Sequence, residues 1–172
     1  MENMKEAQLG IEQEKKEQLV QKLNSVYCER EALENLIRAC QWNTQGSRSA
    51  EFTQILSAVS PDMQNTRQQG QQTAQPFTPS NEVAERISMM GARIPSTYHD
   101  LSEYSKIESP PQSTDVQKNA DYLPKVCEQF SQTTRQAIQA AQQAHDEVTV
   151  QALAEQLHPA EQLATQLRRF QN

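Results

Sequence analysis

One stretch, between Asp115 and Ala141, most constrains what this chain can fold into. Its apolar and small residues recur at alternating intervals of four and three. That spacing is typical of a helix packed in a left-handed bundle, because it keeps one stripe facing the neighbouring helices. The positions on the stripe are Val116, Ala120, Leu123, Cys127, Phe130, Thr134, Ala137 and Ala141. The chain therefore contains a long helix that needs partner helices.

Two further long helical patterns supply such partners. The first covers residues 4–40, where Gly10 is a weak point after which the helix is expected to begin. Its stripe carries one charge, Arg30, whose stem can lie on apolar surface while the guanidinium reaches water or a carboxylate. The second follows Asp146, a good N-cap. The apolar positions of the two stripes are Leu19, Leu23, Val26, Leu33 and Ile37, then Val150, Leu153, Leu157, Leu163, Leu167 and Phe170.

A fourth helical pattern is interrupted. It starts near Ser49, and it should stop before Pro61, because the residue that precedes a proline disfavours helix. Residues 60–80 are rich in Gln and contain Gly and Pro, which predicts a flexible loop. The helix resumes at Asn81, with Ser80 as its N-cap, and ends near Gly91. The apolar residues of the two parts are Phe52, Ile55, Leu56 and Val59, then Val83, Ile87 and Met90.

A short helix is expected at Tyr98–Ser105, followed by a linker with Pro110 and Pro111. The connection that carries it spans about twenty residues and must run the length of the bundle. We therefore expect an all-α, ferritin-like four-helix bundle with a long crossover that carries a short middle helix. Residues 1–18 form a charged N-terminal extension, and residues 19–172 form the bundle, with a Gln/Pro-rich insert at about 60–80.

Composition narrows the function classes. The net charge is −6, and the first eighteen residues hold more acids than bases, so DNA binding is disfavoured. No apolar run is long enough to span a bilayer, and no signal peptide is apparent, which predicts a cytoplasmic protein. The three cysteines form no zinc-ligand pattern and are expected to be reduced. The low apolar content indicates either surface that partners bury or some disorder.

Asn81 and Glu85 are four residues apart and share one face of their helix. A carboxylate one turn from another oxygen ligand, inside a bundle, is how ferritin-like proteins present iron ligands. The alternative is a solvated polar face. At the corner after residue 40, Trp42 is expected to pin two helices together. His99, His145 and His158 have no paired spacing and are expected at the surface.

Taken in order, several of these landmarks resemble the Dps family, the DNA-binding proteins from starved cells or mini-ferritins. Trp42-Asn43 with Gly46 is similar to the family's His-Trp-Asn-x-x-Gly corner, which follows its first helix. The segment from Asn81 to Ala92 is similar to Asp-x-x-Ala-Glu-Arg-x-x-x-x-Gly-Gly. The short helix ending in Ser105–Glu108 resembles the middle helix at the family's two-fold interface. Asp146–Thr149 with Leu153 is similar to the start of the family's last helix, and Leu23-Asn24 to its first.

The resemblance implies a hollow dodecamer that oxidises iron(II), often with hydrogen peroxide, and stores the ferric mineral. It also implies an iron centre shared between two subunits. The family's two His and one acid from one subunit fall here on Gln41, Thr53 and Ser57. Its Asp and Glu from the other subunit fall on Asn81 and Glu85, so the resemblance leaves one carboxylate among the five positions.

Such a set of donors predicts weak iron binding, because iron needs imidazole and carboxylate ligands. The five side chains can instead form a neutral hydrogen-bonded network across the same interface. An active ferroxidase requires other acids, such as Glu51 or Glu82, to replace the missing ligands. On the last helix, the resemblance places three acids at a three-fold pore where they can attract cations; an N-cap with solvated acids explains them equally well. These acids are Asp146, Glu147 and Glu155.

The sequence therefore favours a Dps/ferritin-like protein that is iron-binding, iron-storing or stress-protective by resemblance and has a lost or weakened ferroxidase centre. Enzyme activity stays open: the family oxidises iron(II), whereas the substitutions at most ligand positions favour its absence. The alternative is a non-catalytic bundle that binds a protein partner through the Gln-rich insert. The oligomeric state distinguishes these two hypotheses from each other. Iron oxidation distinguishes both of them from an active ferroxidase.

Overall fold

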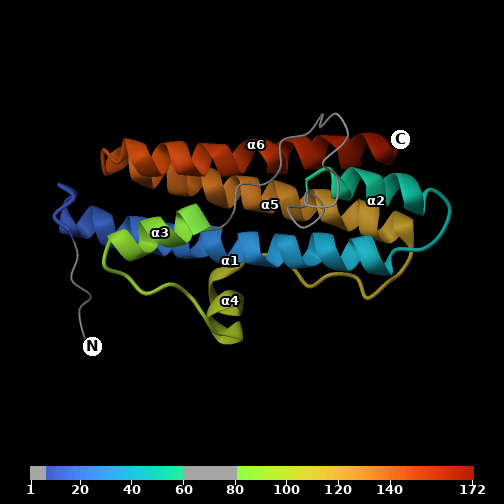
Figure 1. The fold of residues 1–172 in the computed structure, drawn as a ribbon, viewed down its shortest axis with the longest axis horizontal. Coiled ribbons are helices and arrows are strands. Elements are labelled where there is room, and N and C mark those ends of the chain that lie inside the picture. The colour runs from blue at the N-terminus through green and yellow to red at the C-terminus, as the bar shows by residue number, and fades with distance from the viewer. Residues whose placement is uncertain (1–6, 60–80) are drawn as a thin grey trace, which may run out of the picture.

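The computed structural model describes residues 7–59 and 81–172. Within them, three long helices run side by side along the molecule (Figure 1): α1 (Gln13–Asn43), α5 (Val116–Gln143) and α6 (Glu147–Phe170). Two shorter helices, α2 (Ser49–Ser57) and α3 (Asn81–Met89), both pack against α1 and α6 and together take the fourth position. The short α4 (Tyr98–Tyr104) projects from the side of the bundle. The expected four-helix plan with a middle helix on the crossover is confirmed.

The first helix starts and stops where the glycines predict. Gly10 has φ 75°, and α1 begins three residues later. Beyond its end, Gly46 has φ 115°, a conformation that side chains with a Cβ rarely adopt. The turn there is tied to the start of α5, because the Gln45 N–H donates to the Thr114 carbonyl at 2.6 Å. The corner therefore fixes α1 relative to α5.

Arg48 joins the start of α2 to the end of α6. Its backbone has φ 65°, and its Nη1 donates to the Phe170 carbonyl at 2.9 Å. The guanidinium lies 4.0 Å from the centroid of the Phe170 ring, a cation–π contact, and also pairs with Glu51. Phe52 packs on the same ring at a centroid distance of 5.6 Å. This cluster holds α2 in the fourth position of the bundle.

Side-chain caps begin the last two long helices. Asp115 accepts a hydrogen bond from Lys118 N, and Asp146 from Thr149 N, so the expected cap at Asp146 is confirmed. A capping box of Thr97 and Asp100 starts α4. The cap expected at Ser80 lies outside the described residues.

The predicted apolar stripes form the core, and Arg30 lies among them. This side chain is 1% exposed, and its Nη1 donates to Gln156 on α6 at 2.7 Å while Nη2 donates to Glu34 at 2.6 Å. Of the two alternatives expected for the guanidinium, water or a carboxylate, the structure shows the carboxylate of Glu34. Because Gln156 lies on a different helix, the buried charge also links α1 to α6.

Trp42 corrects one expectation. It was predicted to pin two helices together, but 79% of its surface is exposed in the single chain. Trp42 lies beyond the end of the apolar stripe of α1, and the apolar core of the chain is complete without it. Tyr98, at the start of α4, is 93% exposed. Both aromatic rings are thus free of contacts that would bury them within this chain. Among the described helices, none has the length and apolar character needed to cross a membrane.

Candidate metal centre

The five positions assigned to the iron centre fall into two groups. Gln41 is near the end of α1, and Thr53 and Ser57 are on α2. Asn81 and Glu85 are on α3, which lies toward the opposite end of the bundle from α2 (Figure 1). Within one chain the two groups are therefore separate, and they are here called the first half-site (Gln41, Thr53 and Ser57) and the second half-site (Asn81 and Glu85). The resemblance implies that they would meet only between chains, where α2 of one contacts α3 of another.

The first half-site is neutral. The Ser57 hydroxyl donates to the Thr53 carbonyl at 2.8 Å, which uses its hydrogen within its own helix. The Gln41 Nε2 is buried and has no hydrogen-bond partner in the described part of the chain. The predicted neutral network is thus not formed within one chain. Whether it forms between chains stays a prediction.

The second half-site is exposed and holds the carboxylate. Asn81 and Glu85 both face solvent on α3. Burial, and then the negative charges of Glu155 on α6 and Glu85 on α3, raise the pKa of the Glu82 carboxyl. This grouping of three acids across α3 and α6 was not expected from the sequence. Across residues 7–59 and 81–172, no three His, Cys, Asp or Glu side chains are placed to hold a metal ion.

Glu51, one of the two possible substitute ligands, is already engaged. Both of its carboxylate oxygens accept hydrogen bonds from Arg48, at 2.9 and 3.1 Å. The hydrogen bonds from that guanidinium lower the pKa of Glu51. A metal ion at Glu51 must compete with this bidentate pair.

A buried polar cluster that the sequence did not reveal lies where α3 meets the start of α6. Arg86 Nη2 donates to Asp146 Oδ2 at 2.8 Å, and Arg86 Nε donates to Thr149 Oγ1 at 2.9 Å. Burial opposes the lowered pKa of Asp146, but the hydrogen bonds from Thr149 and then Arg86 outweigh it. The charge of Asp146 is therefore balanced inside the chain, while Glu147 and Glu155 are exposed.

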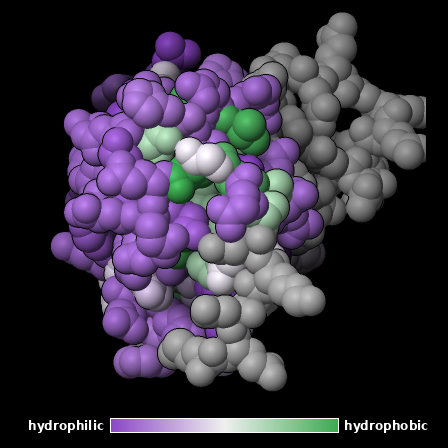
Figure 2. Space-filling model, turned by 90° about the vertical axis from the view of Figure 1, so that its left-hand side faces the viewer, coloured by the Kyte–Doolittle hydropathy of each residue, from purple (hydrophilic) through white to green (hydrophobic). Residues whose placement is uncertain are grey.

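The sequence held one signal for this cluster. Arg86 follows Val83 by three residues, which places its stem beside the apolar stripe of α3, and Asp146 was already the expected cap. The cluster joins the two segments that resemble the Ala-Glu-Arg motif and the start of the last helix. The end of the molecule that faces the viewer in Figure 2 is mostly hydrophilic, with a few hydrophobic residues at its surface. Val148, in the first turn of α6, is 63% exposed.

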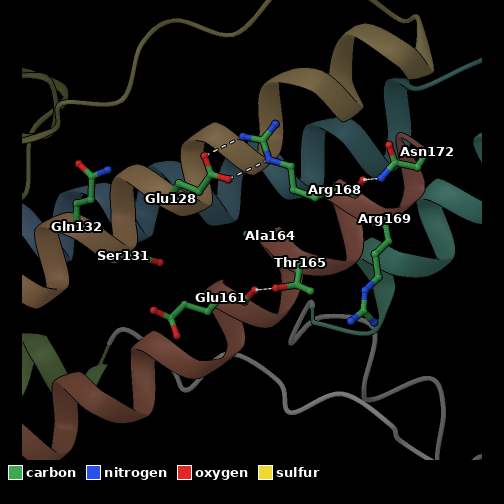
Figure 3. Close-up of a pocket in the computed structure, with 9 residues that line it drawn as sticks. All are labelled: Glu128, Ser131, Gln132, Glu161, Ala164, Thr165, Arg168, Arg169 and Asn172. Atoms are coloured by element: carbon green, nitrogen blue, oxygen red, sulfur yellow. Dashed lines mark hydrogen bonds and ion pairs between the residues drawn. The ribbon is translucent and has the colours of Figure 1, made fainter.

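A pocket of about 550 Å³ lies between α5 and α6, and none of its lining residues belongs to either half-site (Figure 3). Arg168 bridges it with a bidentate pair to Glu128 at 2.9 and 2.8 Å, and Arg135 pairs with Glu161. The Ser131 hydroxyl donates to the Cys127 carbonyl. Glu128 and Arg168 in the lining neutralise each other, Glu161 is paired with Arg135 outside it, and the hydroxyl of Ser131 is bonded to its own helix.

Several solved structures with the same fold are Dps proteins. The Dps protein of Vibrio cholerae O1, described as one of the ferritin-like diiron-carboxylate proteins, matches with a TM-score of 0.78 and 19% identity over 100% of both chains. DpsC from Streptomyces coelicolor matches with a TM-score of 0.79 and 18% identity, over 98% of this chain and 91% of that one. An archaeal Dps homologue from Halobacterium salinarum gives 0.76 and 15% over the same shares.

No protein-family model matches the chain, and no curated protein matches its sequence. At identities below 20% the structural likeness establishes the fold. The chain has the ferritin-like, all-α fold of Dps proteins, as its sequence motifs predicted.

Proposed function

We propose that this chain is a subunit of a closed, Dps-type homo-oligomer, related to iron storage or stress protection, whose interchain ferroxidase centre is lost. The observation that carries the proposal is the donor set at the five positions. The fold supplies the architecture in which two half-sites from different chains can meet, and this chain supplies one carboxylate to such a site. The proposal is therefore a Dps-type assembly that is kept, with an iron-oxidising centre that is lost.

The donors present do not fit iron as a substrate. Iron(II) and the ferric product need anionic oxygen ligands and imidazole nitrogens to offset charge and set geometry. Gln41, Thr53, Ser57 and Asn81 offer neutral amide and hydroxyl groups, and the hydroxyl of Ser57 is bonded to its own helix. Glu85 alone leaves a bound iron pair with most of its charge uncompensated.

Two exposed aromatic residues support assembly. Trp42 lies next to Gln41, and Tyr98 begins α4, the helix that resembles the family's middle helix at the two-fold interface. Their exposed fractions are 79% and 93%, whereas Trp is highly buried on average in folded proteins. In the proposed assembly, the second copy that meets the first half-site also covers the neighbouring Trp42.

The proposal predicts that the assembled wild-type protein does not accelerate iron(II) oxidation. Anaerobic protein is mixed with iron(II) and then with hydrogen peroxide, and ferric absorbance is followed against a protein-free blank. We expect an initial rate equal to the blank, and no change in it on Glu85→Ala. An initial rate well above the blank that Glu85→Ala abolishes contradicts the lost centre and assigns Glu85 as a working ligand.

A further inference from the structure

A groove of about 440 Å³ lies between α1 and α5, and none of its lining residues belongs to a half-site or to α4. The two helices run in opposite directions (Figure 1), so the start of α1 lies beside the end of α5. On each helix the lining residues are three or four positions apart and share one face. The groove, here called the amide groove, is lined by Ala140, Lys22 and five glutamines: Gln18, Gln21, Gln136, Gln139 and Gln143.

Most polar groups of the amide groove are not used within the chain. Gln18 Nε2 donates to Glu14 at 3.4 Å, which is long for a hydrogen bond. In the described residues, the side-chain amides of the other four glutamines and the ammonium of Lys22 have no hydrogen-bond or ion-pair partner. Each amide offers two N–H donors and a carbonyl acceptor, and the ammonium offers three donors. The groove can therefore both donate hydrogen bonds to a bound molecule and accept them from it.

The charge of the amide groove differs from that of its surroundings. Among the described residues that line it, Lys22 is the one charged side chain, and no acid is present. The whole chain, in contrast, has a net charge of −6, and the start of α1 just before the groove carries alternating charges, such as Lys15 and Glu17. Exposed helix faces are usually charged in this way. Neutral amides around one unpaired ammonium therefore indicate a surface that recognises a ligand.

The groups in the amide groove define the chemistry of that ligand. One ammonium matches one carboxylate, whereas a phosphate ester or a nucleic acid carries more negative charge than a single Lys offsets in an acidic chain. The lining also has no aromatic ring on which a base can stack. Amides suit hydroxyl groups, because a hydroxyl both donates and accepts. The volume of about 440 Å³ lies within the range of small-molecule sites, about 300–1,000 Å³.

We propose that the amide groove binds a small polyhydroxy monocarboxylate, that is, a sugar acid. Lys22 pairs with the carboxylate, and the glutamine amides of α1 and α5 form hydrogen bonds with the hydroxyls. The inference goes beyond the proposed function, because the groove shares no residue with the half-sites. It is independent of whether the chain handles iron.

Isothermal titration calorimetry of the full chain at one ionic strength, with D-gluconate, sorbitol and acetate as probes, tests the site. Gluconate has both the carboxylate and the hydroxyls, sorbitol has the hydroxyls alone, and acetate has the carboxylate alone. We expect gluconate to bind saturably at one site per chain and sorbitol to bind at least about tenfold more weakly, because it lacks the charge-assisted contact. Acetate should show no measurable binding.

Lys22→Gln removes the positive charge and keeps a polar side chain. It should weaken gluconate binding at least about tenfold and leave sorbitol binding unchanged. Gln139→Ala removes contacts to hydroxyls, so it should weaken both ligands by the same factor. Lys125→Gln is the matched control, because Lys125 is an exposed lysine of α5 outside the groove, and it should leave both affinities unchanged.

Three results overturn the proposal: gluconate does not bind, acetate binds as well as gluconate, or Lys22→Gln weakens gluconate binding no more than Lys125→Gln does. The three substituted side chains are exposed, so each variant should fold as the wild type does. Native mass, measured on the same samples, tests the proposed assembly separately. A sugar-acid site can therefore fail while the assembly stands, and the assembly can fail while the site stands.

Discussion

Restoring the missing ligands is expected to create iron oxidation in a chain that lacks it. The variant carries Gln41→His, Thr53→His, Ser57→Asp and Asn81→Asp, and retains Glu85. These changes supply the two imidazoles and two carboxylates that the resemblance places at the shared centre. Loss of even an outer-shell partner typically costs 10- to 100-fold at metal sites, so regaining four direct ligands should raise the initial rate by at least about 100-fold. Stopped-flow absorbance under peroxide measures the gain.

A matched control adds the same residue types at four exposed positions of the same helices: Asn43→His, Ala50→Asp, Gln54→His and Ser88→Asp. It should leave the rate at the protein-free level. Adding Glu85→Ala to the restored variant should remove the gain, although the same change is silent in the wild type. An assembled, restored protein without any gain means that the five positions are wrongly assigned.

Breaking the Arg86–Asp146 pair is expected to give the largest loss of stability. Asp146→Ala removes the cap of α6 and leaves the Arg86 guanidinium buried without its carboxylate. Removal of one partner from a buried pair costs about 3–5 kcal/mol. Asp115→Ala is the control, because Asp115 caps α5 in the same way but is exposed, and its loss should cost about 1 kcal/mol. Urea unfolding at one fixed protein concentration measures both.

The Arg86–Asp146 pair also makes the stability of the folded protein depend on pH. The pKa of Asp146 is lowered in the folded state. The stabilisation that its carboxylate gives is therefore complete above its pKa in the unfolded chain, near 3.9, and is lost as pH falls through its lower pKa in the folded protein. Asp146→Ala should therefore destabilise the protein strongly at pH 7 and much less in strong acid. Equal losses for Asp146→Ala and Asp115→Ala at pH 7 contradict a special role for the ion pair.

Local spacing predicted the parts of the structure that local forces determine. The stripe of α5, the glycine after α1 and the cap at Asp146 follow from periodicity and from backbone chemistry within a few residues. Periodicity also placed Arg30 in the core, because its neighbours at three and four residues are apolar.

Partners that are distant in the chain were not predictable in this way. Arg86 and Asp146 are 60 residues apart, and no single-helix pattern indicates that they meet. Glu29, which is fully buried and accepts a hydrogen bond from Lys106 N, was not singled out either, since a helical pattern identifies a buried face but not the chain segment that covers this face. Trp42 was predicted to be buried because its side chain is apolar, but it is exposed, since it lies outside the core of the single chain. The iron positions have the same limit, because a site shared between chains depends on an interface.

The native mass of the full chain, measured by light scattering at low micromolar concentration, tests the central claim most directly. The proposal requires that the half-sites of different chains meet, so it predicts a closed assembly of about twelve chains, with or without iron(II). A monomer or a dimer under both conditions contradicts it. That result indicates instead a ferritin-like bundle that acts outside a cage, for which a bound protein partner is the remaining hypothesis.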